Sequence, residues 1–226
     1  MNIAKKLCIK TSSRDPELTR SKILDAAEAE FAIGGLTAAR TEAIAAQTGV
    51  TKAMIYYYFD SKEDLYRAVI ERCFNEDLML VESLHLDDLP PKEALIAGLR
   101  MMLQVMSAKP HMANIFALES IQNKGKYIPK QTAEILYGKL MCLLEQGIAT
   151  GVFRPLESRH TAINIIGTCV HYFTCLENIK HLWPGKKMLG KEMLQQHDQE
   201  AMDMILAGIL AEPYMSRSID ANIPVI

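Results

Sequence analysis

The chain has 226 residues, of which 49% are hydrophobic and 23% are charged, and its formal net charge is −2. This length can bury a core in one or two domains, and the composition is ordinary for a globular protein. The charge argues against a protein that coats nucleic acid by bulk electrostatics. It permits a specific binder, because the cationic groups need only lie on one face.

The cysteines and the apolar segments indicate a compartment and argue against membrane insertion. There are five cysteines, an odd number, without a Cys-x-x-Cys spacing. This usage suits reduced thiols in a cytoplasmic protein. Residues 1–15 lack the apolar run of a signal peptide, and the apolar stretch from Thr161 to Leu176 is too short to span a bilayer. We therefore expect a cytoplasmic protein without a membrane segment.

The first predicted helix begins at Asp15-Pro16-Glu17. This tripeptide combines a capping carboxylate with proline at the first helical position. Ile23, Ala27 and Phe31 then recur every four residues, which predicts a buried helical stripe. Gly34-Gly35 stops the helix.

Two short helices follow, joined by a glycine-containing turn. The first begins at Thr41 and ends at Gly49, a residue that tolerates a positive φ, and the second covers Thr51 to Tyr58. Two short helices around such a turn are typical of a helix-turn-helix, whose second helix enters the DNA major groove. The residues predicted to lock the two helices together are apolar: Ile44, Val50, Ile55 and Phe59.

The rest of the chain also has a helical pattern. Ser61-Lys62-Glu63-Asp64 resembles a capping box and opens a fourth helix to about Leu84, and Pro90-Pro91 marks a break. Further helices are predicted over residues 92–108, 111–123, 130–150, 158–181 and 190–211. No alternating strand pattern stands out. The predicted fold class is therefore all-α.

The exposed face of the third helix carries side chains suited to DNA. Threonine and tyrosine hydroxyls donate to phosphate oxygens, lysine adds charge, and an alanine methyl can meet a thymine methyl. Tyr58 has two open interpretations, packing in the core or touching DNA. Lys62 lies in the first turn of the fourth helix, where free backbone amides also favour a phosphate. The face comprises Thr51, Lys52, Ala53, Tyr56 and Tyr57.

The residues of this region resemble the N-terminal domain of the TetR family of transcriptional regulators over about residues 17–66. The positions that carry the resemblance are Phe31, Gly35, Thr41, Ile44-Ala45, Gly49-Val50, Ile55-Tyr56, Tyr58-Phe59, Lys62 and Leu65. The resemblance implies an all-helical homodimer with two DNA-binding domains and a larger, variable ligand-sensing domain. The DNA contacts that it implies are Thr41, Thr51, Lys52, Ala53, Tyr56, Tyr57 and Lys62. Glu42 departs from the basic or neutral residue of some members.

We therefore divide the chain into four parts. Residues 15–66 form an N-terminal three-helix helix-turn-helix domain, and residues 67–212 form a larger helical domain for ligand sensing and dimerisation. Residues 1–14 are a basic flexible arm with Lys5, Lys6, Lys10 and Arg14, either a solvated tail or an arm that reaches the adjacent groove. Residues 213–226 form a tail without helical period, either disordered or packed on a neighbour.

The second half carries no recognisable catalytic, cofactor or metal signature, so we expect a regulator rather than an enzyme. Its methionines suggest an adaptable interior of the kind that lines ligand pockets. The candidate pocket residues are Met102, Met106, Phe116, Tyr137, Met141, His171 and Cys175, with Glu119 and Tyr172 as further walls or anchors. A metal held by His171 and Cys175 lacks a third ligand, and a buried histidine and cysteine are the simpler interpretation.

The last two helices, in residues 158–211, resemble the family's dimerisation pair. The side chains expected at that interface are Ile163, Ile166, Val170, Phe173, Met202, Ile205, Leu206 and Ile209. The C-terminal half is also similar to the branch of the family that includes the pyrimidine-utilisation regulator, through Gly151-Val152-Phe153-Arg154 and His171-Tyr172. This similarity assigns no ligand.

The sequence therefore predicts a homodimeric repressor that binds a near-palindromic double-stranded DNA operator and is released by an unknown small molecule. The alternative is a DNA-binding regulator without a small-molecule ligand, controlled by a protein partner or acting constitutively.

Overall fold

The structure is a computed structural model that describes residues 15–212. The predictions for the basic arm, residues 1–14, and for the tail, residues 213–226, lie outside these residues. The α-helices are α1 (Pro16–Ala38), α2 (Thr41–Thr48), α3 (Lys52–Tyr58), α4 (Lys62–Ser83), α5 (Pro91–Ala108), α6 (Pro110–Leu118), α7 (Lys130–Ala149), α8 (Ser158–Thr174), α9 (Leu176–Ile179) and α10 (Lys191–Ile209). Short turns η1 (Leu86–Asp88), η2 (Glu119–Asn123) and η3 (Lys180–Leu182) lie between them.

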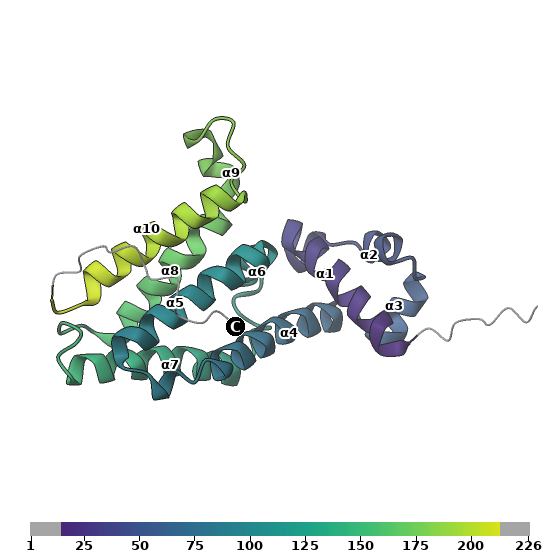
Figure 1. Cartoon of the computed structure of the whole chain (residues 1–226). Helices are drawn as coiled ribbons and strands as arrows, with labels where there is room; N and C mark the ends of the chain where they lie inside the picture. The colour runs from purple at the N-terminus through teal and green to yellow at the C-terminus, as the bar shows by residue number, and fades with distance from the viewer. Residues whose placement is uncertain (1–14, 213–226) are drawn as a thin grey trace, which may run out of the picture.

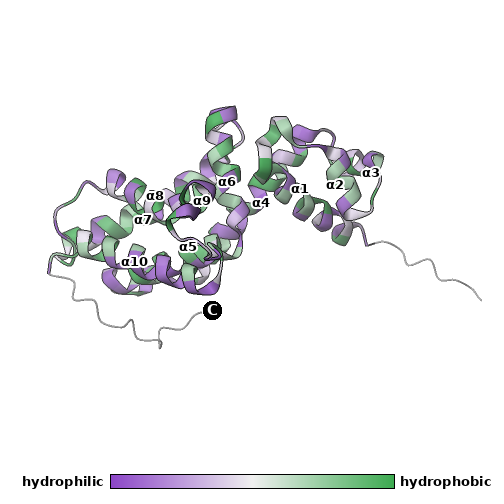
Figure 2. Ribbon diagram, turned by 90° about the horizontal axis from the view of Figure 1, so that it is seen from above, coloured by the Kyte–Doolittle hydropathy of each residue, from purple (hydrophilic) through white to green (hydrophobic). Residues whose placement is uncertain are grey.

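The described part of the chain is helical and has no strand beyond one isolated bridge, between Phe153 and Leu210. The predicted all-α fold is therefore confirmed. The first three helices form a small unit, and α4 runs from this unit along the bundle formed by α5 to α8 and α10 (Figure 1). Hydrophilic and hydrophobic residues alternate along the helices, as expected where each helix buries one face (Figure 2).

The small N-terminal unit is built around the predicted stripe of α1. Ile23, Ala27 and Phe31 are fully buried, and Asp15 accepts the predicted capping bond from the Glu17 amide at 3.0 Å. Ile44, Ile55 and Phe59 are at most 5% exposed, and Val50 packs partly buried against the same cluster. The predicted lock between α2 and α3 is thus confirmed. It fixes the recognition helix on a rigid base.

The predicted stop at Gly34-Gly35 is a break inside α1. Gly35 has φ 69° and ψ −167°, a combination that essentially only glycine adopts. A short helical turn continues to Ala38, and the chain then reverses into α2. The break lets the end of α1 meet η2, because the Gln122 side chain donates to the Gly34 carbonyl at 3.2 Å.

Helix α4 joins the N-terminal unit to the bundle. It begins where predicted, with the Ser61 hydroxyl accepting from the Asp64 amide at 3.0 Å, and it contacts α1, α5 and α7. Its buried face carries Leu65, Val69 and Cys73, which recur every four residues. A single helix therefore belongs to the packing of both parts.

The bundle has its own apolar core between α5, α7, α8 and α10. Leu99, Leu144, Phe153 and Leu206 are at most 2% exposed within it. Gly147 of α7 is required by this packing, since a Cβ there would collide with the Phe153 ring. This core is separate from the apolar cluster that includes the N-terminal unit.

Two helix boundaries differ from the sequence-based prediction. The helix expected over residues 158–181 ends at Thr174, and the one expected over 111–123 ends at Leu118 and continues as the π-helical turn η2. At the first site the Thr174 hydroxyl and the Cys175 thiol both donate to the His171 carbonyl, so side chains compete with the helical backbone. No helix in the described part is long and apolar enough to cross a membrane.

Candidate nucleic-acid interface and its connection to the bundle

The turn between α2 and α3 sets the angle of the recognition helix. Gly49 ends α2 in the left-handed conformation, with φ 71°, and its amide donates to the Ala45 carbonyl at 2.9 Å. Thr51 then caps α3 by accepting from the Met54 amide at 3.2 Å. Since both caps are satisfied within the chain, α3 needs no partner to hold its position.

The predicted contact face of α3 is open to solvent. Thr51, Lys52 and Ala53 are exposed, Tyr56 is 38% exposed, and Tyr57 is 82% exposed. An apolar ring that protrudes this far from a seven-residue helix contributes nothing to the core. It is available to a partner.

Tyr58 packs on the core, which decides between its two interpretations. Its side chain is partly buried against the N-terminal cluster. Its ring lies 5.4 Å from the Tyr57 ring in an edge-to-face arrangement. The two consecutive tyrosines therefore differ in role: Tyr58 packs on the core, and its ring contacts the exposed ring of Tyr57.

Glu42 pairs with the cation of the recognition helix. The Lys52 ammonium donates to the Glu42 carboxylate at 2.5 Å and lies 5.9 Å from the centre of the Tyr56 ring. The hydrogen bond lowers the pKa of Glu42 and raises the pKa of Lys52. Both side chains are solvent-exposed, so the pair is weak and easily exchanged for a phosphate.

Two other predicted contacts, Lys62 and Thr41, lie at the junction of α1 and α2. The Lys62 ammonium donates to the carbonyls of Thr37 and Ala39 at 3.3 and 3.1 Å. Thr41 is 4% exposed. Lys62 therefore holds the α1–α2 connection in place and Thr41 is buried beside it, whereas Ala53 and Tyr57 of α3 are exposed.

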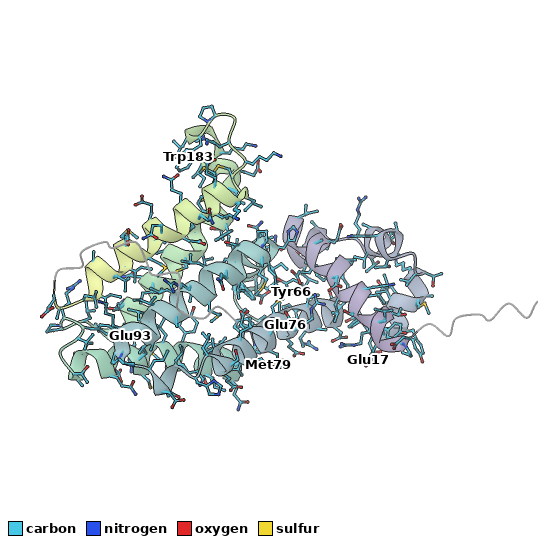
Figure 3. All side chains as sticks on the ribbon, viewed as in Figure 1. Glu17, Tyr66, Glu76, Met79, Glu93 and Trp183 are labelled. Atoms are coloured by element: carbon cyan, nitrogen blue, oxygen red, sulfur yellow. The ribbon has the colours of Figure 1, made fainter. Side chains whose placement is uncertain are left out.

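A buried carboxylate connects the N-terminal unit to the bundle. Glu119, at the start of η2, is fully buried and accepts from the Tyr127 amide at 2.8 Å and the Asn123 side chain at 2.6 Å. The Tyr66 ring of α4 stands edge-on to Phe31 at 4.8 Å and to Tyr127 at 5.4 Å. Tyr66 thus lies where α1, α4 and the end of α6 come together (Figure 3).

Burial and the Glu119 charge raise the pKa of Tyr66, so its phenol keeps its proton. The Tyr66 hydroxyl is therefore a potential donor near the Glu119 carboxylate, which is an acceptor. In the structure the hydroxyl is buried and its geometry does not meet that of a hydrogen bond. Sequence reasoning missed this role for Tyr66, because a tyrosine on the inner face of a helix is typical of an ordinary core residue.

Ion pairs join α4 to its neighbours on the opposite side of this junction. Arg72 donates to Asp25 at 2.6 Å and to Glu28 at 2.9 Å, both on α1. One turn further along, Glu76 accepts from Lys109, which lies between α5 and α6 (Figure 3). α4 is therefore tied to α1 and to the α5–α6 corner at adjacent positions.

The predicted pocket residues are distributed over several places. Met102 and Met141 pack on the core of the bundle, whereas Met106 and Phe116 belong to the cluster that continues into the N-terminal unit. Tyr137 is 40% exposed, His171 is exposed, and Cys175 is half-buried with its thiol on the His171 carbonyl. Among the described residues no group of three or more His, Cys, Asp or Glu side chains could hold a metal ion.

Most of the side chains expected at the subunit interface belong to the core of one subunit, so that part of the prediction is wrong. The apolar period of α10 and of the end of α8 faces the interior of the subunit, not outward. The buried residues are Phe173, Met202, Ile205, Leu206 and Ile209, each at most 6% exposed. Ile163 is 57% exposed, and Ile166 and Val170 are partly buried.

A capped helix-turn-helix with an exposed aromatic and cationic face, carried on an all-helical bundle, defines a DNA-binding transcriptional regulator. Comparisons with known proteins agree. Residues 23–69 match the profile of the bacterial regulatory proteins of the tetR family, and residues 91–205 match the tetracyclin repressor-like C-terminal domain. The chain belongs to the TetR family of transcriptional regulators.

Individual relatives extend the match over nearly the whole chain. The HTH-type transcriptional regulator RutR of Escherichia coli strain K12 is 25% identical over 199 residues, covering 87% of this chain and 93% of RutR. The HTH-type transcriptional repressor NicS of Pseudomonas putida is 29% identical over 165 residues, or 71% and 78% of the two chains. The ketosteroid transcriptional regulator KstR2 of Mycobacterium tuberculosis has the same fold, with a TM-score of 0.66, 23% identity, and 85% and 95% coverage.

Proposed function

We propose that this regulator is a homodimeric repressor that binds a near-palindromic operator in the cytoplasm and is released by a small molecule. The observation that carries the proposal is the exposed face of α3, with Thr51, Lys52, Ala53, Tyr56 and Tyr57 held by an internally capped turn. Residues 15–66 act as the DNA-binding unit, and residues 67–212 act in sensing and dimerisation. The repressor direction is supported by the relative NicS, which is named as a repressor.

On this proposal the tyrosines and Lys52 grip phosphates more than they read bases. Tyr57 is the most exposed large side chain of α3, and its hydroxyl can reach a phosphate oxygen. Ala53 is small enough to bring the helix close to a thymine methyl. Lys62 and Thr41 contribute chiefly by fixing the α1–α2 junction, with a phosphate contact as a second role.

The dimer is proposed to form through the outer faces of α8 and α10. Any such dimer must place its two recognition helices about one helical turn of DNA apart, roughly 34–36 Å. Helix α8 exposes Ile163 and Gly167 at a helical spacing, and α10 exposes Met204 and Ala207. Two large apolar side chains beside small ones suit close helix packing across a twofold axis.

This interface is tested by Gly167→Glu. A Cβ at Gly167 meets nothing within 4 Å in one subunit, so the subunit itself accommodates the new side chain. Across a helix pair the carboxylate would be buried without a partner, so we expect dissociation into folded monomers, seen by analytical ultracentrifugation and circular dichroism. Gly138→Glu on α7, another glycine with open space, is the matched control and should stay dimeric. A fully dimeric Gly167→Glu protein would contradict the proposed face.

The signal is proposed to pass through α4. This helix shares the Tyr66–Glu119 junction and the Arg72 ion pairs with α1, so a shift of α6 or η2 moves the N-terminal unit with it. A ligand that prefers the DNA-incompetent spacing then lowers operator affinity by the same factor by which DNA lowers ligand affinity.

The decisive experiment is selection of bound DNA from a random pool with the full-length protein. We expect an enriched inverted repeat whose half-sites are centred about one helical turn apart, and fluorescence anisotropy should then show much weaker binding when either half-site is scrambled. Failure to enrich any sequence over random DNA would refute the operator. A protein that binds its operator but responds to no small molecule would favour the alternative, in which a protein partner controls it or it acts constitutively.

A further inference from the structure

Two neighbouring side chains on α10 each have a polar atom that is shut off from solvent and unsatisfied. They are Nε2 of His197 and Oδ1 of Asp198, and neither has a hydrogen-bond partner within residues 15–212. Burial of a polar atom without a partner costs free energy, and most such atoms in native proteins are satisfied. Two of them at consecutive positions of one helix in the sensing half therefore indicate that something else completes their hydrogen bonds.

Aromatic rings of α8 hold His197 in one orientation. The imidazole is stacked on the Tyr172 ring, with centroids 4.2 Å apart and an angle of 17° between the planes. The Phe173 ring stands edge-on to the imidazole at 5.9 Å. The Tyr172 hydroxyl donates to the Met188 carbonyl at 2.6 Å, which fixes this ring in turn. The group is thus preorganised before any ligand arrives.

The unsatisfied nitrogen of His197 is a hydrogen-bond acceptor. Burial lowers the pKa of His197, so the ring is neutral near pH 7, while a hydrogen bond to the backbone of Cys169 works in the opposite direction. A backbone group that stabilises the protonated imidazole must be a carbonyl oxygen. The Nδ1–H group of His197 therefore donates to the backbone of Cys169. In a neutral imidazole the remaining nitrogen, Nε2, then carries a lone pair.

Asp198 is a second acceptor and adds a negative charge. It makes no ion pair with any cationic side chain of the described residues. Burial raises its pKa to about 6, so the carboxylate is mainly ionised at neutral pH. Its charge raises the pKa of Cys169 and Tyr172 on α8, so the partly buried carboxylate lies near these two side chains. A buried anion without a counter-ion is best compensated by a cation.

We propose that these residues bind a small organic cation, a protonated amine or amidine on an apolar body. Its N–H groups donate to Asp198 and His197, and its body packs against the apolar cluster of which Tyr172, Phe173 and Met188 are part. The Tyr172 ring, which is stacked on His197 and lies near the carboxylate, adds an aromatic surface that favours the same cation. The inference rests on the proposed sensing function, since it names the chemical class of the effector.

The position of the group suits an effector site. α8 and α10 pack on each other and on α5, and α8 also contacts α6, which continues into η2 at the Tyr66–Glu119 junction. The segment between α8 and α10 contacts the group at Met188, whose carbonyl accepts from Tyr172; Met188 is 9% exposed, while Leu182 and Trp183 of the same segment remain exposed (Figure 3). A ligand that displaces Met188 would therefore act on the apolar cluster that extends from this group to the N-terminal unit.

The test uses three probes of nearly identical shape with the full-length protein: benzamidine, a cation with N–H donors; benzamide, its neutral counterpart; and benzoate, an anion. Binding is measured by isothermal titration calorimetry and by the shift of the thermal unfolding midpoint. We expect benzamidine to bind at least about tenfold more tightly than benzamide, and benzoate not to bind. Equal binding of all three, or no binding of benzamidine, would overturn the proposal.

The variant Asp198→Asn tests whether Asp198 is the residue that binds the cation. It should weaken benzamidine binding at least about tenfold. Glu200→Gln, which removes an exposed acid two positions further along the same helix, should leave binding unchanged. The unliganded Asp198→Asn protein should unfold at a temperature no lower than the parent, because the buried charge has no ion-pair partner. A destabilised variant that still binds benzamidine normally would show that Asp198 is structural.

Measurement of operator affinity separates this inference from the function on which it rests. If the protein binds its selected operator but benzamidine neither binds nor weakens that complex, the cation site fails and the regulator stands. If benzamidine binds through Asp198 while no operator can be selected, the site stands and the proposed function fails.

Discussion

Replacement of Gly35 by alanine tests the contact between the DNA-binding unit and the bundle. Gly35 has φ 69° and ψ −167°, a region open essentially to glycine alone, and a non-glycine residue there costs about 1–3 kcal/mol. A Cβ would also collide with the Gln122 side-chain oxygen, so that side chain must move away. The Gln122 amide then no longer donates to the Gly34 carbonyl, a hydrogen bond that contributes about 0.5–1.5 kcal/mol.

The two contributions together predict a decrease of about 2–4 kcal/mol in the free energy of unfolding. For a chain of this size the thermal midpoint should fall by roughly 2–4 °C per kcal/mol, or about 4–16 °C in all. The assay is thermal unfolding followed by circular dichroism, with all variants at one protein concentration because dimerisation also affects the midpoint.

Two further variants separate strain from collision. Gly138→Ala lies in the middle of α7 with open space at its Cβ, so it should be neutral or stabilising by about 0.5–1 kcal/mol. Gln122→Ala removes the collision but also the same hydrogen bond, so the double variant Gly35→Ala/Gln122→Ala should be about as stable as Gly35→Ala alone, and the two single effects should not add. A thermal unfolding midpoint of Gly35→Ala equal to that of the parent protein, or full additivity of the two substitutions, would refute this account of the junction.

Three other perturbations give sharp expectations. Glu42→Gln frees Lys52 for phosphate, so operator affinity measured by anisotropy should rise about twofold to tenfold and the salt dependence should steepen, whereas Glu71→Gln on the exposed face of α4 should do neither. Removal of residues 1–13 deletes three lysines, and the slope of log affinity against log salt should flatten by about 0.9 for each phosphate that the arm neutralises; an unchanged slope would remove the arm from the mechanism. Burial raises the pKa of Asp77 to about 6, so the folded state holds this proton more tightly than the unfolded state does, and stability falls as pH rises from about 4 to about 6. Asp77→Asn should therefore be more stable than the parent at pH of about 7.5, by about 1–3 kcal/mol, and equal to it near pH of about 4; the same difference at both pH values would contradict the assignment.

Local signals allowed the N-terminal unit to be predicted almost residue by residue. Capping residues, a stop at glycine and short apolar spacings are interactions between near neighbours in sequence, so Asp15, Ser61 and Gly49 could be assigned without knowledge of the tertiary fold. Which tyrosine is buried and which is exposed could not be predicted in this way. Consecutive residues of a helix point about 100° apart, and the sequence alone does not say which direction faces the core. The contact that buries Tyr58 comes from tertiary packing.

The second half was less predictable because apolar period does not distinguish a subunit core from a subunit interface. Ile205 and Leu206 have the pattern expected of either, and only the packing of α10 on α5 and α8 assigns them to the core. The cation site did leave a trace in the sequence. His197 continues the four-residue series of Met193 and Ala201, which are both buried, so a titratable side chain occupies a core position. The signal was present, but it became meaningful only once Asp198 was seen to lack a partner.

The places where this chain departs from local rules coincide with its contacts between parts. Gly35 has a backbone conformation that other residues avoid, η2 is a π-helical turn, and Glu119 is a fully buried carboxylate, and all three lie where α1 meets the end of α6. A sequence optimised only for stability would avoid each of these costs. Their concentration at one junction is what a two-position joint requires, because a junction already under strain needs less free energy from a bound effector to change its arrangement. We therefore expect Glu119→Gln, which removes the charge but keeps the shape, to alter the coupling between effector and operator more than the affinity for either alone.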